Sequence, residues 1–185
     1  MTLSQNALTT LSAAKTSLQI PLSDTTRDSL IELLIESMSA AVESYCSRAI
    51  AQRTIEDEPH EVCGKKISLD QYPVSGLTKI VVNGSEIALD NVTLDANAGI
   101  VTLPLSARGV VLVDYTAGIC AGQSTTSRDI QLAVWKWLES VLSRESGEGI
   151  TREQLGDYVV NYADENGWPP PIVCSLLEIY RAERV

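Results

Sequence analysis

The chain has 185 residues and a formal net charge of −10, from 14 basic and 24 acidic side chains, which suits one acidic folding unit. Hydrophobic residues make up 44% and phenylalanine is absent, so aliphatic side chains have to fill the core. A single histidine and the shortage of clustered Lys and Arg argue against zinc-dependent catalysis and against a protein that grips nucleic acid. We therefore expect no enzyme, no metal site and no cofactor.

The N-terminal sequence has no basic cluster followed by an apolar stretch, and no apolar run approaches the ~18 residues of a membrane-spanning helix. We expect neither a signal peptide nor a membrane protein. The cysteines, Cys46, Cys63, Cys120 and Cys174, are scattered without CxxC spacing. That pattern favours four free thiols in a reducing cytoplasm.

Residues 9–52 have a helical pattern. A short helix is expected near 10–18, ending before Pro21, and a long one from Asp28 to about Ala51. The long helix carries two neighbouring apolar stripes. The first consists of Leu30, Leu34, Met38, Ala41, Tyr45 and Ala49, and the second of Ile31, Ile35, Val42, Cys46 and Ile50.

Together the two stripes are wider than the ~100° apolar face of a helix that packs on one small core. Two interpretations fit this width. The helix is either central and buried by its own chain, or buried partly against another subunit.

From about residue 53 to 116 the pattern becomes strand-like. The Asn83-Gly84 dipeptide between two apolar stretches predicts a tight β-hairpin, and 95–99 predicts a second turn. The segment Val110–Tyr115 alternates least and is expected to be a buried strand. These segments predict a small antiparallel sheet of five or six strands.

Helix returns over about 127–144, followed by a connector over 145–168 in which 151–156 suits one or two helical turns. An amphipathic helix is expected over Ile172–Arg184, led by three prolines. Its apolar stripe and the basic residues at its end are Ile172, Val173, Leu176, Leu177, Tyr180, Arg181 and Arg184. This helix either folds back on its own core or docks in the groove of a partner.

The predicted fold class is α+β: a helical bundle with a long central helix, an inserted small antiparallel β-sheet and a C-terminal amphipathic helix. The predicted division is a single body over 1–168 and a docking helix over 169–185.

No residue pattern with catalytic spacing appears. His60 and Cys63 are three residues apart, but no second pair of ligands accompanies them at zinc-site spacing. The acidic run Glu56-Asp57-Glu58 is typical of a solvated strand edge. Trp135 and Trp137 are two apart on a helix and cannot share a face, so base stacking by this pair is not expected.

The order of these segments resembles the head–tail connector (adaptor, or head-completion) family of tailed bacteriophages and prophages. The likeness is a diffuse pattern over nearly the whole chain rather than one diagnostic motif. The segments that carry it are 8–15, 30–37, 42–48, 68–74, 113–118, 130–134 and 150–162.

The resemblance implies a non-catalytic virion protein of the neck, made in the host bacterial cytoplasm. Family members form a ring, usually of twelve subunits, beneath the portal protein. The ring extends the channel through which DNA passes, without sequence-specific binding, and is the attachment platform for a stopper or tail-completion protein. The resemblance places portal docking on Ile172–Arg184, with the residues named above. It places the ring contact on the long helix, where we assign Ile31, Ile35, Val42, Cys46 and Ile50.

Two alternative functions stay open from the sequence. One is another ring protein of the phage neck or tail completion. The other is a DNA-packaging accessory protein, against which the acidic charge balance counts.

Overall fold

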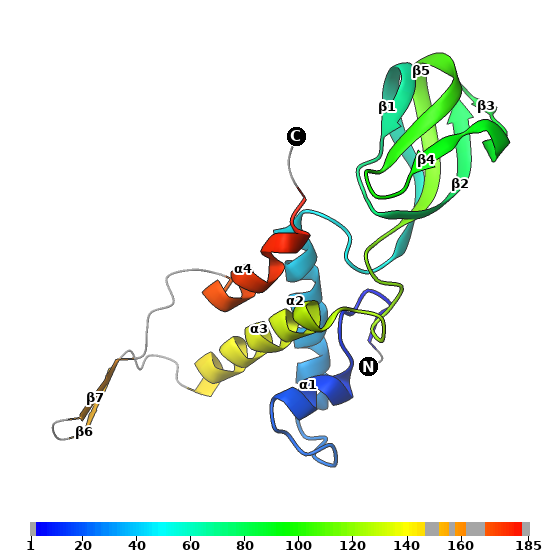
Figure 1. The fold of residues 1–185 in the computed structure, drawn as a ribbon. Helices are drawn as coiled ribbons and strands as arrows, with labels where there is room; N and C mark the ends of the chain where they lie inside the picture. The colour runs from blue at the N-terminus through cyan, green and yellow to red at the C-terminus, as the bar shows by residue number, and fades with distance from the viewer. Residues whose placement is uncertain (1–2, 147–151, 156–157, 162–168, 183–185) are drawn as a thin grey trace. The chain divides into compact units, whose positions relative to one another are not determined.

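The computed structural model describes residues 3–146, 152–155, 158–161 and 169–182 (Figure 1). The chain divides into two compact units. The first, here called the helical unit, combines Met1–Cys46 with Ser127–Val185, and the second, the sheet unit, is Ser47–Thr126. The functional division predicted at residue 168 is a different one and stays a prediction.

Four α-helices lie among the described residues of the helical unit: α1 over Leu11–Ser17, α2 over Asp28–Cys46, α3 over Arg128–Ser146 and α4 over Pro171–Leu177. The Thr10 side chain caps α1 by accepting a hydrogen bond from the backbone N–H of Ala13. Helix α2 ends five residues earlier than predicted. Ser47 adopts a left-handed conformation with φ of 54°, which stops a helix at this position.

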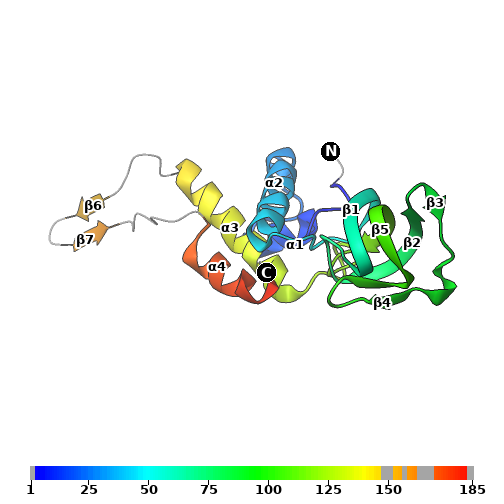
Figure 2. The same ribbon diagram turned by 90° about the horizontal axis from the view of Figure 1, so that it is seen from above.

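The helices pack through apolar faces spaced at helical intervals. Helix α2 buries Ile31, Ile35, Met38 and Val42, and Leu138 of α3 joins the same core. Figures 1 and 2 both show α4 lying along α3, and these two helices are in contact. The core of the unit therefore combines helices from both ends of the chain.

Two short strands lie in the connector between α3 and α4. Strand β6 spans Arg152–Leu155 and pairs in antiparallel fashion with β7, Tyr158–Asn161. The prediction of helical turns over 151–156 was wrong. The Val159-Val160 pair in the facing segment has high strand propensity, and strand pairing takes precedence over the local capping pattern.

The sheet unit contains five antiparallel strands in the order β1-β5-β2-β3, with β4 paired to β5. The bounds are Arg53–Ser68 for β1, Val74–Val82 for β2, Ser85–Glu86 for β3, Thr93–Asp95 for β4 and Ile100–Ala117 for β5. The predicted Asn83-Gly84 hairpin is confirmed. Both turn residues have positive φ, 48° and 83°, and Val82 pairs with Ser85.

Strand β5 supplies much of the sheet core. Val111, Val113, Tyr115 and Ala117 are all buried, whereas Val110 in the same strand is exposed. The expectation that all of Val110–Tyr115 forms a buried strand was therefore wrong. This stretch alternates with the period of two that a sheet with one covered face requires.

The predicted fold class was wrong. The chain is a mixed α/β protein with a large β share, not a helical bundle with a long central helix and a small inserted sheet. Helices α2 and α3 have 19 residues each and α1 and α4 only seven, so no single helix is central. Strands β1 and β5 have 16 and 18 residues and their sheet has its own core.

Candidate protein interface

The C-terminal helix is shorter than predicted because its helical hydrogen bonding changes at Leu177. Pro171 occupies the first turn of α4, where a missing N–H is tolerated. After Leu177 a 3₁₀ turn, η2, continues over Glu178–Tyr180. Arg184 lies outside the described residues.

One face of α4 is used inside the chain. Val173 and Leu177 are fully buried, and α4 contacts α3. Of the two interpretations of the terminal helix, the structure therefore contains the fold-back on the chain's own core. These two side chains hold the helix in place and are not available to a partner.

The opposite face of this segment is exposed and apolar. Ile172 is 50% exposed and Ile179 76% exposed, while Leu176 and Tyr180 are half-buried and Arg181 is exposed. Ile172, Leu176 and Ile179 follow at intervals of four and three residues, the spacing of one helical face. This outward face is the part of the predicted docking stripe that a partner can reach.

Polar contacts fasten the end of the segment to α2 and α3. The Tyr180 hydroxyl lies 3.0 Å from Ser127 Oγ and donates to Asp129 Oδ2 at 3.2 Å. Tyr45 donates to Glu178 Oε2 at 3.3 Å. The backbone N–H of Ala182 donates to the carbonyl oxygen of Cys46 at 2.8 Å. These hydrogen bonds hold α4 and η2 in place, so that the outward face of α4 has a fixed position in the helical unit.

Burial, with the neighbouring Cys174 and Glu178, raises the pKa of Tyr45 to about 12. In the unfolded chain the Tyr45 phenol has its ordinary value near 10. Above about pH 10 the unfolded state therefore binds fewer protons than the folded state, and stability falls as the pH rises toward 12. We expect urea midpoints to drop over this range, and the drop to be smaller in Tyr45→Phe. Equal drops in both proteins would contradict the assignment.

The five residues predicted for the ring contact are all buried within this chain. Each is at most 1% exposed: Ile31, Ile35, Val42, Cys46 and Ile50. The first four lie on the inward side of α2, while Ile50 lies beyond the helix in the sheet unit. A subunit contact through α2 would have to use its other side, where Leu33 is exposed.

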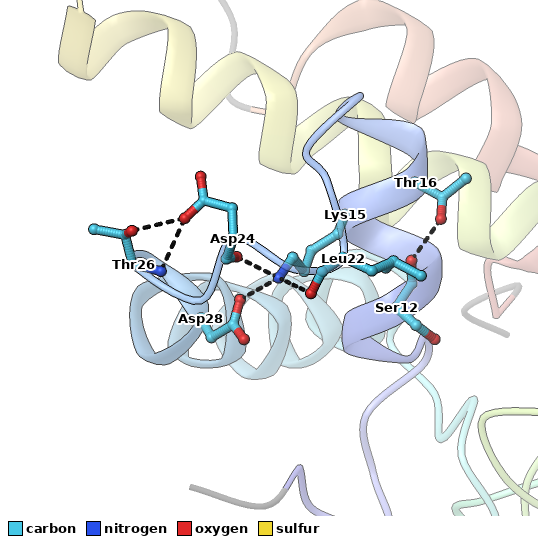
Figure 3. Close-up of polar contacts among 7 residues, drawn as sticks. All are labelled: Ser12, Lys15, Thr16, Leu22, Asp24, Thr26 and Asp28. Atoms are coloured by element: carbon cyan, nitrogen blue, oxygen red, sulfur yellow. Dashed lines mark hydrogen bonds and ion pairs between the residues drawn. The ribbon is translucent and has the colours of Figure 1, made fainter.

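A buried lysine holds the loop that leads into α2 (Figure 3). No sequence pattern predicted the role of this lysine. Lys15 of α1 is 2% exposed. Its Nζ donates to Asp28 Oδ1 at 2.7 Å and to the carbonyl oxygens of Asp24 at 2.6 Å and Leu22 at 3.3 Å. Hydrogen bonds from Thr26 lower the pKa of the Asp24 carboxyl, which helps to order the same loop.

His60, considered for a metal or catalytic pair with Cys63, contacts a carboxylate. His60 Nε2 is 2.7 Å from Glu58 Oε1, which also accepts the backbone N–H of Asp70, while Cys63 is exposed. In the described part of the chain, no three His, Cys, Asp or Glu residues are grouped so that they could hold a metal ion. Within the same residues, no helix combines the length and the apolar character that crossing a bilayer requires.

Trp135 and Trp137 both belong to the helical unit. Trp135 Nε1 donates to Thr9 Oγ1 at 2.9 Å, and Trp137 is buried. Both side chains therefore take part in the packing or bonding of this unit.

Comparison with known families decides the identity of the chain. The family model of the head completion protein matches residues 7–182. The chain belongs to the head completion protein family. Membership was predicted from the diffuse order of segments along the chain and is confirmed. The general function predicted with it, a structural head–tail connector, is confirmed as well.

Solved structures with the same fold come from gene transfer agent (GTA) particles. A chain in the neck of an empty GTA particle, computed with C6 symmetry, is 19% identical with a TM-score of 0.67, covering 100% of this chain and 95% of that one. A chain in the virion of a native GTA particle is 18% identical with a TM-score of 0.65, covering 100% and 94%.

A third similar chain, in the neck of a native GTA particle computed with C12 symmetry, is 18% identical. Its TM-score is 0.58, with 100% of this chain and 97% of that one covered. At these identities the likeness shows the fold of this head completion protein, and the predicted place in the virion neck agrees with it. No curated protein matches the chain.

Proposed function

We propose that this head completion protein is the adaptor of the virion neck, a ring that sits beneath the portal protein, extends the DNA channel and carries the stopper or tail. The observation that carries the proposal is its full-length likeness to chains of neck assemblies computed with C6 and C12 symmetry, together with the family match over 7–182. A closed ring needs heterologous contacts, in which two different surfaces of each subunit meet.

The role is structural, without a catalytic step. The charge balance supports a conduit that does not hold DNA. Twelve subunits of net charge −10 would carry about −120 formal charges, and like charge discourages contact with phosphates.

The portal contact is assigned to the outward face of α4 and η2. Ile172 and Ile179 are large apolar side chains exposed to solvent, and burying such a side chain is worth ~1.5–3 kcal/mol. Arg181 beside them has its guanidinium 5.2 Å from the centre of the Tyr45 ring. Val173 and Leu177 keep their inward positions in this assignment, so α4 docks as part of the folded unit.

Replacing both exposed isoleucines, as Ile172→Asp/Ile179→Asp, is expected to weaken binding to purified portal at least tenfold, because a contact would bury two uncompensated charges. Binding is measured by interferometry with immobilised portal. The matched control is Leu22→Asp, an exposed leucine of the same unit, which is expected to bind like the wild type. Unchanged affinity of the double variant would remove α4 from the contact.

These surface variants are sharper than removal of the last helix, because truncation would also uncover the core that Val173 and Leu177 cover. Native mass spectrometry tests the ring itself, since twelve subunits of 20.0 kDa give about 240 kDa. Binding to a tail-completion protein but not to portal would favour another neck ring. DNA binding that disappears with added salt would favour a packaging protein.

A further inference from the structure

The end of the sheet unit farthest from its connectors to the helical unit carries basic and apolar side chains together. The pairing of β1 with β5 starts with Arg53 opposite Ala117 at the connector end and continues to Gly64 opposite Ala107, where the register shifts before the pairs from Lys66 to Ser68. We define the basic tip as the exposed basic and large apolar side chains that β1 and β5 supply at this end: Lys65, Lys66, Leu105, Arg108 and Val110. One exposed carboxylate, that of Glu61 opposite Val110, borders this set.

The three cations of the basic tip have no acidic partner. Within the described residues, no carboxylate lies within ion-pair distance of Lys65, Lys66 or Arg108. Lys65 Nζ instead donates to the carbonyl oxygen of Pro104 at 3.2 Å. By contrast, Lys79 of the same sheet lies 3.9 Å from Asp114. In a chain with 24 acidic residues and 14 basic ones, the tip has more basic than acidic side chains even when the exposed Glu61 beside it is included.

The apolar members of the tip argue for a protein partner. Leu105 is 77% exposed and Val110 48% exposed. A contact with DNA phosphates would engage the cations and leave these side chains in water. A contact with a protein surface would bury them, which is favourable by about 25 cal/mol per Å².

An acidic counterpart lies on the same strand. Glu56 and Asp57, here called the acidic edge, are exposed at a register shift between Ile55 and Glu58. Strand β1 is an edge strand of the sheet. Nine residues separate Glu56 from Lys65, at most about 30 Å along a strand, and neither side chain forms an ion pair within the described residues.

We propose that the basic tip of one subunit docks on the acidic edge of the next copy of this chain in the ring. The inference rests on the proposed function, because it takes the ring as given. Tip and edge are different surfaces of the same subunit, as a heterologous contact requires. The bulge at Asp57, with φ of 52°, and Pro59 prevent regular addition of a strand to this edge, so side chains make the contact.

Two charge variants test the contact. The tip variant is Lys66→Glu/Arg108→Glu. The edge variant is Glu56→Lys/Asp57→Asn, in which asparagine preserves the left-handed position. Each variant alone is expected to need an at least tenfold higher concentration for ring assembly at low salt, because like charges then face each other. A 1:1 mixture is expected to restore assembly, since a reversed tip meets a reversed edge and a native tip meets a native edge.

The control for the tip variant is Arg27→Glu/Lys136→Glu, which makes the same change of net charge in the helical unit and is expected to assemble like the wild type. Assembly is followed by sedimentation velocity of the full chain, with and without portal. If both variants assemble like the wild type, or if the mixture gives no rescue, the contact is wrong. A tip variant that assembles normally but loses DNA binding would make the tip a DNA contact. If the wild type forms no ring even with portal, the proposed function fails instead.

Disulfide cross-linking tests whether the subunits contact each other head to tail, without a change of charge. Cys63 is exposed beside the tip, opposite Arg108, and Thr54 is exposed beside the acidic edge. Under mild oxidation Thr54→Cys is expected to give a ladder of species larger than dimers, because each subunit then links to two neighbours. Wild type and Thr54→Cys/Cys63→Ser are expected to stop at dimers or monomers. A Thr54→Cys product that stops at dimers would mean paired β1 edges and would overturn the head-to-tail contact.

Discussion

Replacing the buried lysine by a side chain of similar length, Lys15→Met, is expected to destabilise the helical unit by about 3 kcal/mol. The methionine loses all three hydrogen bonds of Nζ, to Asp28, Asp24 and Leu22, and leaves the Asp28 carboxylate without its cation. Because Asp28 keeps about a quarter of its side chain in contact with water, the expected loss lies at the low end for a broken buried ion pair.

The matched control is the same substitution in an exposed pair. Lys136 lies 2.8 Å from Glu139, nearly the same distance as in the Lys15–Asp28 pair at 2.7 Å, but the side chains of Lys136 and Glu139 are 41% and 54% exposed. Lys136→Met is expected to cost less than about 0.5 kcal/mol. The measurement is the urea unfolding of the helical unit by circular dichroism. Similar midpoints for the two variants would show that burial of Lys15 contributes nothing beyond a surface pair.

Local patterns in the sequence predicted elements well where one face of an element is buried. The inward stripe of α2 and the turn at Asn83-Gly84 follow directly from residue spacing and turn chemistry. The length of β1 did not, because it runs through Pro59 and across register shifts at 55–58 and 64–66. Such shifts break the alternation that identifies a strand, and the sheet was therefore predicted to be a small insertion.

The candidate interface was predicted in outline only. Amphipathic spacing identified the stripe on the terminal helix, but spacing alone cannot tell which side chains the chain uses itself. Val173 and Leu177 pack inward while Ile172 faces water, and Ile179 was not in the predicted set. Lys15 escaped notice because its partner Asp28 lies 13 residues away across a loop, outside any local spacing rule. Its burial is a tertiary effect.

The largest loss in the sheet unit is expected from Gly118→Ala, at about 3–5 kcal/mol. Gly118 follows β5 and has φ of 145°, a conformation that a residue with a Cβ rarely adopts. An added Cβ would lie 2.4 Å from the Cα and 2.6 Å from the N of Gln52. These are backbone atoms held by a hydrogen bond from the Gln52 N–H to the Cys120 carbonyl oxygen at 2.8 Å, so they cannot move aside without breaking that link.

Gly76→Ala provides the contrast within the same sheet. Gly76 of β2 pairs with Thr116, two residues before Gly118, and a Cβ there would meet nothing within 4 Å. This substitution is expected to be neutral or to stabilise by up to about 1 kcal/mol, because alanine loses less backbone freedom on folding. The two variants are compared by their urea unfolding midpoints, measured by circular dichroism of the sheet. A Gly118→Ala midpoint as high as that of Gly76→Ala would mean that the two connecting segments at Gln52 and Cys120 separate readily. The sheet unit would then tolerate movement at the point where the chain enters and leaves it.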